Sequence, residues 1–87
     1  MENYNRSNKD YLGIYYYLND KLHRTDGPAC ELYNGSKFWY QYGELHRIDG
    51  PAEEYSSGIK YWYYEGRYIT NKSQEEFERY IKLKLFW

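Results

Sequence analysis

The sequence predicts a mainly β protein in which stacked antiparallel β-hairpin repeats form one curved sheet, with a capping α-helix at the C-terminal end. Three observations predict this fold: a block of eight residues that recurs after 23 residues, aromatic runs bounded by glycines, and a capping-box motif that opens an amphipathic segment. The 87 residues are expected to form a single domain. Its parts are a polar N-terminal arm over 1–11, hairpin repeats over 12–70, and a helix with its tail over 71–87.

The repeat is the strongest signal in the chain. Residues 22–29 read LHRTDGPA and residues 45–52 read LHRIDGPA, so seven of eight positions are identical at an offset of 23. The same offset relates Trp39 to Trp62, and it also matches several glycine, lysine and tyrosine positions. So many identities in one register indicate units that stack on one another, with atypical end units that cap the stack.

Each unit is expected to be a β-hairpin. The runs over 36–42 and 59–64 are rich in aromatic residues and bounded by glycine, which is typical of strands. The stretches before them, 29–33 and 52–55, are expected to supply the partner strands.

Turn signals join these strands. Asn34-Gly35 predicts a two-residue hairpin turn because both residues tolerate a positive φ, and residues 56–58 fill the same place in the next unit. Gly43 and Gly66 mark a second tight turn after each aromatic strand. In the loop that follows, the proline after Asp-Gly lacks an N–H donor and is expected to end the strand pairing.

The C-terminal segment has helical features. It opens on the capping box Ser73-Gln74-Glu75-Glu76, with serine at the N-cap. Acidic residues occupy the first turn and lysines the last, which suits the helix dipole, so a helix is predicted over 73–84. The apolar face that should close the open end of the sheet consists of Phe77, Tyr80, Ile81 and Leu85, and Phe86 and Trp87 are expected in the same seam.

Composition limits the core and the class of function. The chain has 14 Tyr, 3 Trp and 3 Phe but no valine, so rings must build the core or an exposed binding face. Its net charge of −1, from 12 basic and 13 acidic residues, argues against general nucleic-acid binding. No signal peptide or membrane span is visible, and Cys30 is the single cysteine, so a cytoplasmic protein without a disulfide framework is expected.

The repeat resembles the MORN repeat, through Trp39-Tyr40-Gln41-Tyr42-Gly43-Glu44-Leu45-His46 and the copy around Trp62-Tyr63-Tyr64-Glu65-Gly66. It is more similar to a divergent MORN-like family of viral and phage proteins, in which a His-Arg-x-Asp-Gly-Pro-Ala repeat ends in a Glu-Glu-Phe helix, matched here at 75–77. The resemblance covers about residues 14 to 80. The chain departs from ordinary MORN repeats by placing Asp-Gly-Pro-Ala where Gly-x-Gly usually falls.

The resemblance implies a fold and a set of roles. The fold is a single curved sheet of stacked hairpins. MORN-type arrays serve as protein-interaction scaffolds and dimerisation modules, and binding of lipid headgroups has been proposed for them. For a member of the viral group, the resemblance implies an accessory protein that acts against host defence in the host cytoplasm.

The duplicated His-Arg-x-Asp set has two interpretations. As an anion site, the arginines offer planar donor forks, the histidines add donors, and the glycine turns expose backbone N–H groups to a phosphate or carboxylate. As a structural motif, the aspartates accept turn N–H groups and pair with arginines of the same or the next repeat, while the histidines stack on neighbouring tyrosines. The residues concerned are His23, Arg24, Asp26, His46, Arg47 and Asp49.

The aromatic strands offer a second candidate surface. Strand alternation sends Trp39 and Trp62 to one face of the sheet, and Tyr40 and Tyr63 to the other. One face must be core. The other is expected to be packing, a tyrosine-rich interface with a protein partner or a second copy, or a stacking platform for a base or sugar.

Catalysis and metal binding have little support in the sequence. There is no Ser/His/Asp arrangement with a nucleophile elbow, and the two histidines and one cysteine lack metal-site spacing. No cofactor and no metal are expected. Glu31 and Glu54 recur in register and are expected on the solvent face of their strands.

Two functional hypotheses follow. The first is a non-catalytic interaction module that binds a protein partner or itself through the aromatic sheet. The alternative is a ligand-sequestering protein in which the loop arginines and histidines grip the phosphates of a nucleotide, while Trp39 or Trp62 stacks on the base.

Overall fold

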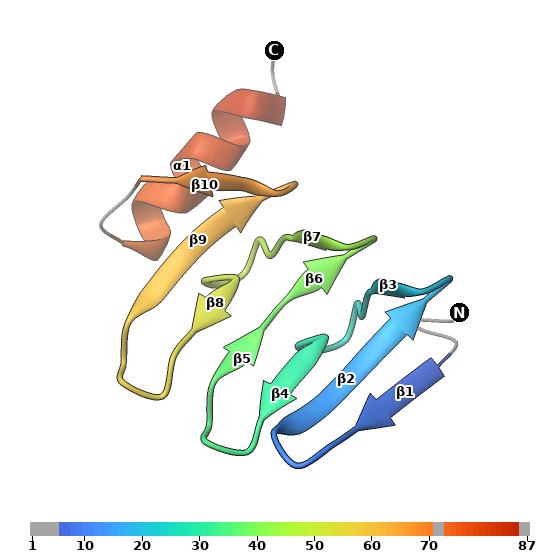
Figure 1. The fold of residues 1–87 in the computed structure, drawn as a ribbon. Helices are drawn as coiled ribbons and strands as arrows, with labels where there is room; N and C mark the ends of the chain where they lie inside the picture. The colour runs from blue at the N-terminus through green and yellow to red at the C-terminus, as the bar shows by residue number, and fades with distance from the viewer. Residues whose placement is uncertain (1–5, 71–72, 86–87) are drawn as a thin grey trace.

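The computed structural model describes residues 6–70 and 73–85, and within them the protein is an open antiparallel sheet with one C-terminal helix (Figure 1). The strands are β1 (Arg6–Lys9), β2 (Gly13–Leu18), β3 (Lys21–Leu22), β4 (Cys30–Leu32), β5 (Lys37–Phe38), β6 (Tyr40–Gln41), β7 (Glu44–Leu45), β8 (Glu53–Glu54), β9 (Lys60–Tyr64) and β10 (Arg67–Ile69); the helix is α1 (Gln74–Leu85). The mainly β class with a C-terminal helix is therefore confirmed.

The sheet has the order β1-β2-β4-β5-β8-β9-β10, with β3 paired to β2 and with β6 and β7 paired to each other. In the first two units, β2 and the β5–β6 segment each pair with two strands that follow them in the chain. The C-terminal half of β2 pairs with the return strand β3, whereas its N-terminal half pairs with β4 (Figure 1). In the next unit, β6 pairs with β7 and β5 pairs with β8. The His-Arg-x-Asp-Gly-Pro loop leaves the sheet between these two strands. It joins β3 to β4 in the first unit and β7 to β8 in the second.

Trp39 marks the change of partner in the second unit. Its N–H donates to the Ala52 carbonyl (2.8 Å), while its carbonyl accepts the His46 N–H (3.0 Å). Because these two groups serve different strands, the single strand expected over 36–42 is interrupted, and it forms β5 and β6.

The predicted two-residue turn at Asn34-Gly35 is wrong. Gly35 alone of the pair has a positive φ, of 100°, and Leu32 N–H donates to the Ser36 carbonyl (2.9 Å) around a three-residue loop. The reason is local: the Asn34 side-chain oxygen accepts the Ser36 N–H (2.9 Å), which holds Asn34 in an ordinary turn conformation.

Two-residue turns lie instead at the opposite ends of the hairpins. Both central residues have positive φ in each of them, which matches the right-handed twist of the flanking strands. These turns are Asn19-Asp20 (φ 50° and 66°), Tyr42-Gly43 (52° and 84°) and Glu65-Gly66 (50° and 81°).

The predicted N-terminal arm needs a partial correction. Residues 6–9 form the edge strand β1, which pairs with β2 from Arg6↔Tyr17 to Lys9↔Ile14. All four residues are exposed, so the segment carries no hydrophobic alternation that would reveal a strand. It pairs because the edge of β2 offers unsatisfied backbone groups. Residues 1–5 lie outside the described part.

The helix begins where the capping box predicts, and it packs through the predicted apolar face. Glu76 N–H donates to the Ser73 hydroxyl (3.2 Å), and the helix runs over Gln74–Leu85, within one residue of the prediction. Phe77 is fully buried, and Tyr80 and Ile81 are half-buried. The Leu85 side chain and residues 86–87, also assigned to this seam, lie outside what the structure describes.

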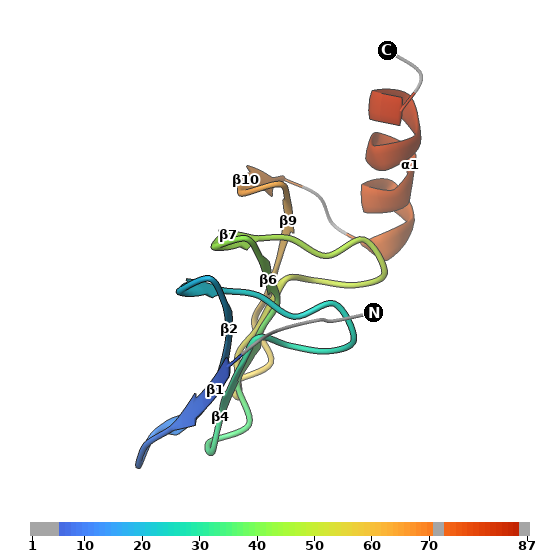
Figure 2. The same ribbon diagram turned by 90° about the vertical axis from the view of Figure 1, so that its right-hand side faces the viewer.

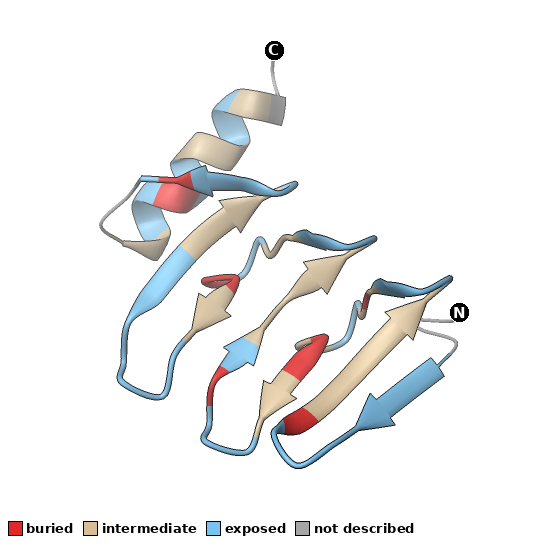
Figure 3. Cartoon of the chain, in the orientation of Figure 1, coloured by how far each residue is buried: buried red, intermediate tan, exposed pale blue. Residues whose placement is uncertain are grey.

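The two faces of the sheet differ. The Asp-Gly-Pro loops and α1 project from one face, whereas the hairpin tips at β3, β7 and β10 turn toward the other (Figure 2). Trp39 and Trp62 share one face, as alternation predicts. It is the loop face, because Arg47 stacks on Trp39 and Gln74 of the helix binds Trp62. Buried residues are concentrated where the loops and helix meet the sheet (Figure 3); they include Ala29, Ala52, Ile69 and Phe77.

We expect Phe77→Ala to destabilise the protein by about 3–5 kcal/mol, because it removes a fully buried ring and leaves a cavity between the helix and the sheet. Leu83→Ala is the matched control on the exposed side of the same helix, and it should change stability by less than about 0.5 kcal/mol. Urea unfolding followed by circular dichroism measures both. Equal effects would show that α1 is not packed through Phe77.

Candidate functional site

Each Asp-Gly-Pro loop is built around one arginine. The Arg47 guanidinium lies over the Trp39 ring, 3.7 Å from its centroid. Its Nε donates to Asp49 (2.8 Å), and its Nη1 donates to the Pro51 carbonyl (3.0 Å) and to Glu54 (3.0 Å). One side chain therefore ties the start of the loop to its turn, its proline and the strand that follows.

The first loop repeats this arrangement. Arg24 lies over the Tyr16 ring at 4.1 Å, and it donates to Asp26 (2.9 Å), the Pro28 carbonyl (3.2 Å) and Glu31 (3.0 Å). The recurrence explains the spacing Arg-x-Asp-Gly-Pro-x-x-Glu. It confirms one branch of the structural interpretation, the pairing of each aspartate with the arginine of its own repeat.

The glycine of this motif lies close to the stacked guanidinium. A Cβ on Gly50 would lie 2.7 Å from the Arg47 Cζ atom, closer than non-bonded carbons approach. At Gly27 the corresponding approach to Arg24 is 3.2 Å. The glycine thus makes room for the stacked guanidinium.

The histidines link each unit to the next hairpin tip. His23 Nδ1 accepts the Tyr42 N–H (3.0 Å), and His46 Nδ1 accepts the Glu65 N–H (2.9 Å). Their rings also lie beside tyrosines: His23 is 4.4 Å from the Tyr42 ring and His46 is 5.1 Å from the Tyr64 ring, as the structural interpretation predicts. An Nδ1 that accepts an N–H must be unprotonated.

Burial reinforces the neutral form of both histidines. His23 is 2 % exposed, and desolvation lowers its pKa below the ordinary value of 6.5. Desolvation also lowers the pKa of His46, against smaller opposing effects of Glu65 and Glu44. The histidines are therefore structural acceptors in this fold.

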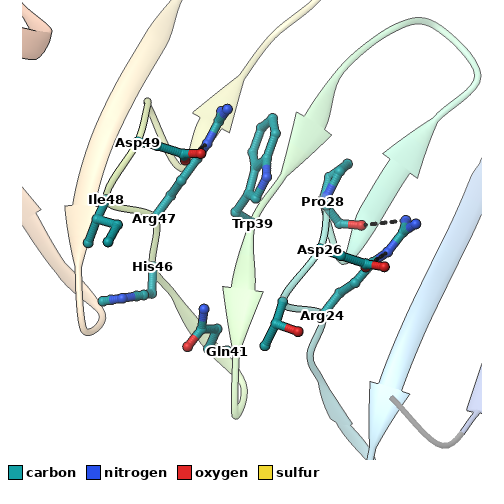
Figure 4. Close-up of a pocket in the computed structure, with 11 residues that line it drawn as sticks. Arg24, Asp26, Pro28, Trp39, Gln41, His46, Arg47, Ile48 and Asp49 are labelled. Carbon is teal, nitrogen blue, oxygen red and sulfur yellow. Dashed lines mark hydrogen bonds and ion pairs between the residues drawn. The ribbon is translucent and has the colours of Figure 1, made fainter. Parts of the chain in front are cut away.

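Between the two loops lies a hollow of about 550 Å³ (Figure 4). It brings together six of the eight predicted site residues: Arg24, Asp26, Trp39, His46, Arg47 and Asp49. His23 is not in its lining because it is buried under a hairpin tip. Trp62 is absent as well, since its indole Nε1 donates to the Gln74 side chain of α1 (2.7 Å).

The charges around this hollow indicate whether it could bind an anion. Each guanidinium contacts two carboxylates, so Arg24 and Arg47 together face four acidic groups, those of Asp26, Glu31, Asp49 and Glu54. The net charge of the two clusters is negative, and two nitrogens of each arginine are already engaged. Both arginines that line the hollow are thus already neutralised by carboxylates, so the geometry favours the structural interpretation over an anion site.

Sequence reasoning missed the roles of three residues in this region. Glu31 and Glu54 were expected to face solvent, yet both bind the loop arginines; their recurrence at the repeat offset was the signal. Gln74 was assigned only to the capping box. Its amide bridges Trp62 and the Ile48 carbonyl (3.1 Å), so the helix holds the last long strand where an arginine loop holds the earlier ones.

The face opposite the loops carries many aromatic side chains. Cross-strand partners, which share a face, run Tyr15↔Cys30↔Phe38↔Glu53↔Tyr61 across β2, β4, β5, β8 and β9. A chain of ring contacts extends the row from Phe38 through Tyr55 and Tyr61 to Tyr68, with centroids 5.4 to 6.0 Å apart. We call the surface formed by Tyr15, Phe38, Tyr40, Tyr55, Tyr61, Tyr63 and Tyr68 around Glu53 the aromatic face.

The aromatic face is open in the described structure. Tyr55, Tyr61 and Tyr68 are 38 %, 36 % and 51 % exposed, although Tyr61 belongs to a paired strand. The loops and α1 lie on the other side (Figure 2). The rings here are thus partly available for contact with another molecule.

We expect Arg47→Lys to destabilise the protein by about 1–3 kcal/mol, because lysine loses the stacked fork that binds Pro51 and Glu54 together. Asp49→Ala should cost less than about 1 kcal/mol, since the Asp49 side chain is 82 % exposed. Urea midpoints rank the two variants. The reverse ranking would mean that the arginine is not the centre of the loop.

We expect acid to destabilise the protein below pH 6.5, the ordinary histidine pKa. Because the folded-state pKa values of His23 and His46 are lowered, the unfolded chain binds protons first, and stability is lost as pH falls through the folded values. Asparagine can accept the same N–H without titrating. The double variant His23→Asn/His46→Asn should therefore lose less stability over this range in urea titrations. An unchanged acid slope would assign the effect to other groups.

Among the described residues, no group of three His, Cys, Asp or Glu side chains is placed to hold a metal ion. The one helix in that part of the chain is too short and too polar to cross a membrane. Comparisons with protein-family models, curated proteins and solved structures find no match to this chain. The resemblance to MORN-like repeats therefore stays a prediction.

Proposed function

We propose that the chain is a non-catalytic interaction module that binds a protein partner, or a second copy of itself, through the aromatic face. One observation carries this proposal: a cluster of contacting, partly exposed tyrosines, Tyr55, Tyr61, Tyr63 and Tyr68, lies on the side of the sheet that neither the loops nor the helix covers (Figure 2). Contiguous exposed apolar patches mark interaction sites more often than they occur by accident. Tyrosine is enriched at interfaces, and its rigid ring orders at low entropic cost.

The loop face has a scaffolding role in this proposal. The arginine clusters and histidine links recur at the repeat offset, which supports stacked MORN-like units as the architecture. The histidines carry no catalytic step in it, because each uses Nδ1 to accept a backbone N–H. The viral resemblance supports an accessory role on host components in the host cytoplasm.

The sequestering alternative places a nucleotide in the hollow between the loops. Trp39, Arg24 and Arg47 all line that hollow, which supports it. The four carboxylates that contact the arginines weigh against it, as does the Arg47 guanidinium already stacked on the Trp39 ring. We therefore rank the interaction module first.

The test compares two double variants. Tyr61→Ser/Tyr68→Ser removes exposed rings from the aromatic face, whereas Tyr11→Ser/Tyr33→Ser removes exposed rings at hairpin turns. We expect concentration-dependent mass in light scattering, or photo-crosslinks to a host protein from a probe at Tyr55, to be lost in the first variant and kept in the second.

Two outcomes would contradict this expectation. Association that is unaffected by Tyr61→Ser/Tyr68→Ser, or absent from the unmodified protein in both assays, removes the interaction module. A melting temperature raised by ATP or inorganic phosphate would favour the sequestering alternative in its place.

A further inference from the structure

Glu53 occupies an unusual position on the aromatic face. It is half-buried in the cross-strand row, with Phe38 opposite it on one side and Tyr61 on the other. The Tyr55 hydroxyl donates to its carboxylate (3.3 Å). Tyr40 and Tyr63 follow these two partners by two positions, which directs their side chains to the same face, and burial followed by the negative charge of Glu53 raises the pKa values of both hydroxyls.

This carboxylate has no cation among residues 6–70 and 73–85. The adjacent Glu54, on the opposite face, forms an ion pair with Arg47 at 3.0 Å, and Glu31 does the same with Arg24. Glu53 forms no ion pair within the same part of the chain, where the groups around it are tyrosine hydroxyls and rings. A partly buried carboxylate gains more from a cation than an exposed one does.

The protein itself shows what such surroundings bind. Arg6 lies over the Tyr17 ring at 4.4 Å and pairs with Asp20 at 3.0 Å. The loop arginines follow the same rule on the other face, where each stacks on one ring and pairs with carboxylates. Three times a ring and a carboxylate together hold a guanidinium. Within the described residues, the Glu53 cluster has the rings and the carboxylate but no guanidinium.

We propose that Glu53, with the rings of Tyr40, Tyr61 and Tyr63, forms a subsite for an arginine side chain presented by the protein partner. The inference rests on the proposed function, because it concerns the same face. Arginine fits better than lysine, since its planar fork stacks on a ring and donates to a carboxylate at the same time. The hairpin tips at β3, β7 and β10 bend toward this side of the sheet (Figure 2).

The test uses two capped peptides that differ in one functional group. One has the sequence Ser-Arg-Ser-Arg-Ser, and the other has citrulline, a neutral isostere, in place of arginine. Amide and tyrosine-ring signals of the protein are followed by NMR during each titration. We expect the arginine peptide to shift the signals of Tyr40, Tyr61 and Tyr63, and the citrulline peptide to bind at least about tenfold more weakly.

Variants of the protein test which residues bind the arginine side chain of the peptide. Glu53→Gln keeps the shape of the side chain and should weaken the arginine peptide about tenfold, a loss of about 1.4 kcal/mol. Glu75→Gln, at an exposed position on α1, is the control and should leave binding unchanged. Tyr61→Leu keeps apolar area but removes the ring quadrupole, and it should also weaken binding. A native amide spectrum for each variant shows that the fold is intact.

The outcomes separate this inference from the proposed function. No binding of the arginine peptide, equal binding of both peptides, or shifts confined to the loop face would overturn the arginine subsite. Loss of partner binding or self-association in Tyr61→Ser/Tyr68→Ser would still support the aromatic face as an interface. A lysine peptide that binds as tightly as the arginine peptide would overturn the preference for a guanidinium.

Discussion

The stack of a loop arginine on the ring of its own long strand is the interaction on which the rest of the structure depends. Arg47 on Trp39 and Arg24 on Tyr16 each fix a loop that carries the chain out of the sheet and back again. That return brings β4 to the N-terminal half of β2 and brings β8 to β5. The sheet can therefore continue although its core has few aliphatic side chains, because guanidinium groups and rings replace them.

The two faces of the sheet therefore differ in chemistry. In the loops, carboxylates pair with the arginines, and the histidines accept backbone N–H groups of the hairpin tips, so little capacity is left for a ligand. On the aromatic face, Glu53 accepts a hydrogen bond from the Tyr55 hydroxyl and forms no ion pair with any residue that the structure describes. A residue type repeated in every unit thus holds the units together, whereas Glu53, which Cys30 replaces one unit earlier, is a better candidate for recognition.

Much of the fold follows from local sequence rules. The capping box located α1, and alternation placed Trp39 and Trp62 on one common face, because both signals depend on neighbouring residues. The strand β1 could not be predicted, since its pairing depends on the edge of β2 and not on its own polar residues. The pairing of Glu54 with Arg47 could not be predicted either. A glutamate on a strand faces solvent unless a loop folds back over it, and the position of this loop is known only from the structure.

The hydrogen bonds from hairpin tips to the preceding unit have an architectural consequence. Tyr42 and Glu65 each give their N–H to the histidine 19 positions earlier, and Gly43 and Gly66 give theirs to the carbonyls of Leu22 and Leu45. Every such bond joins nearest neighbours in the series. Duplication of one 23-residue segment would then reproduce its own attachments at both borders, and the length of the array would be a variable that gene duplication can alter without redesign of the parts.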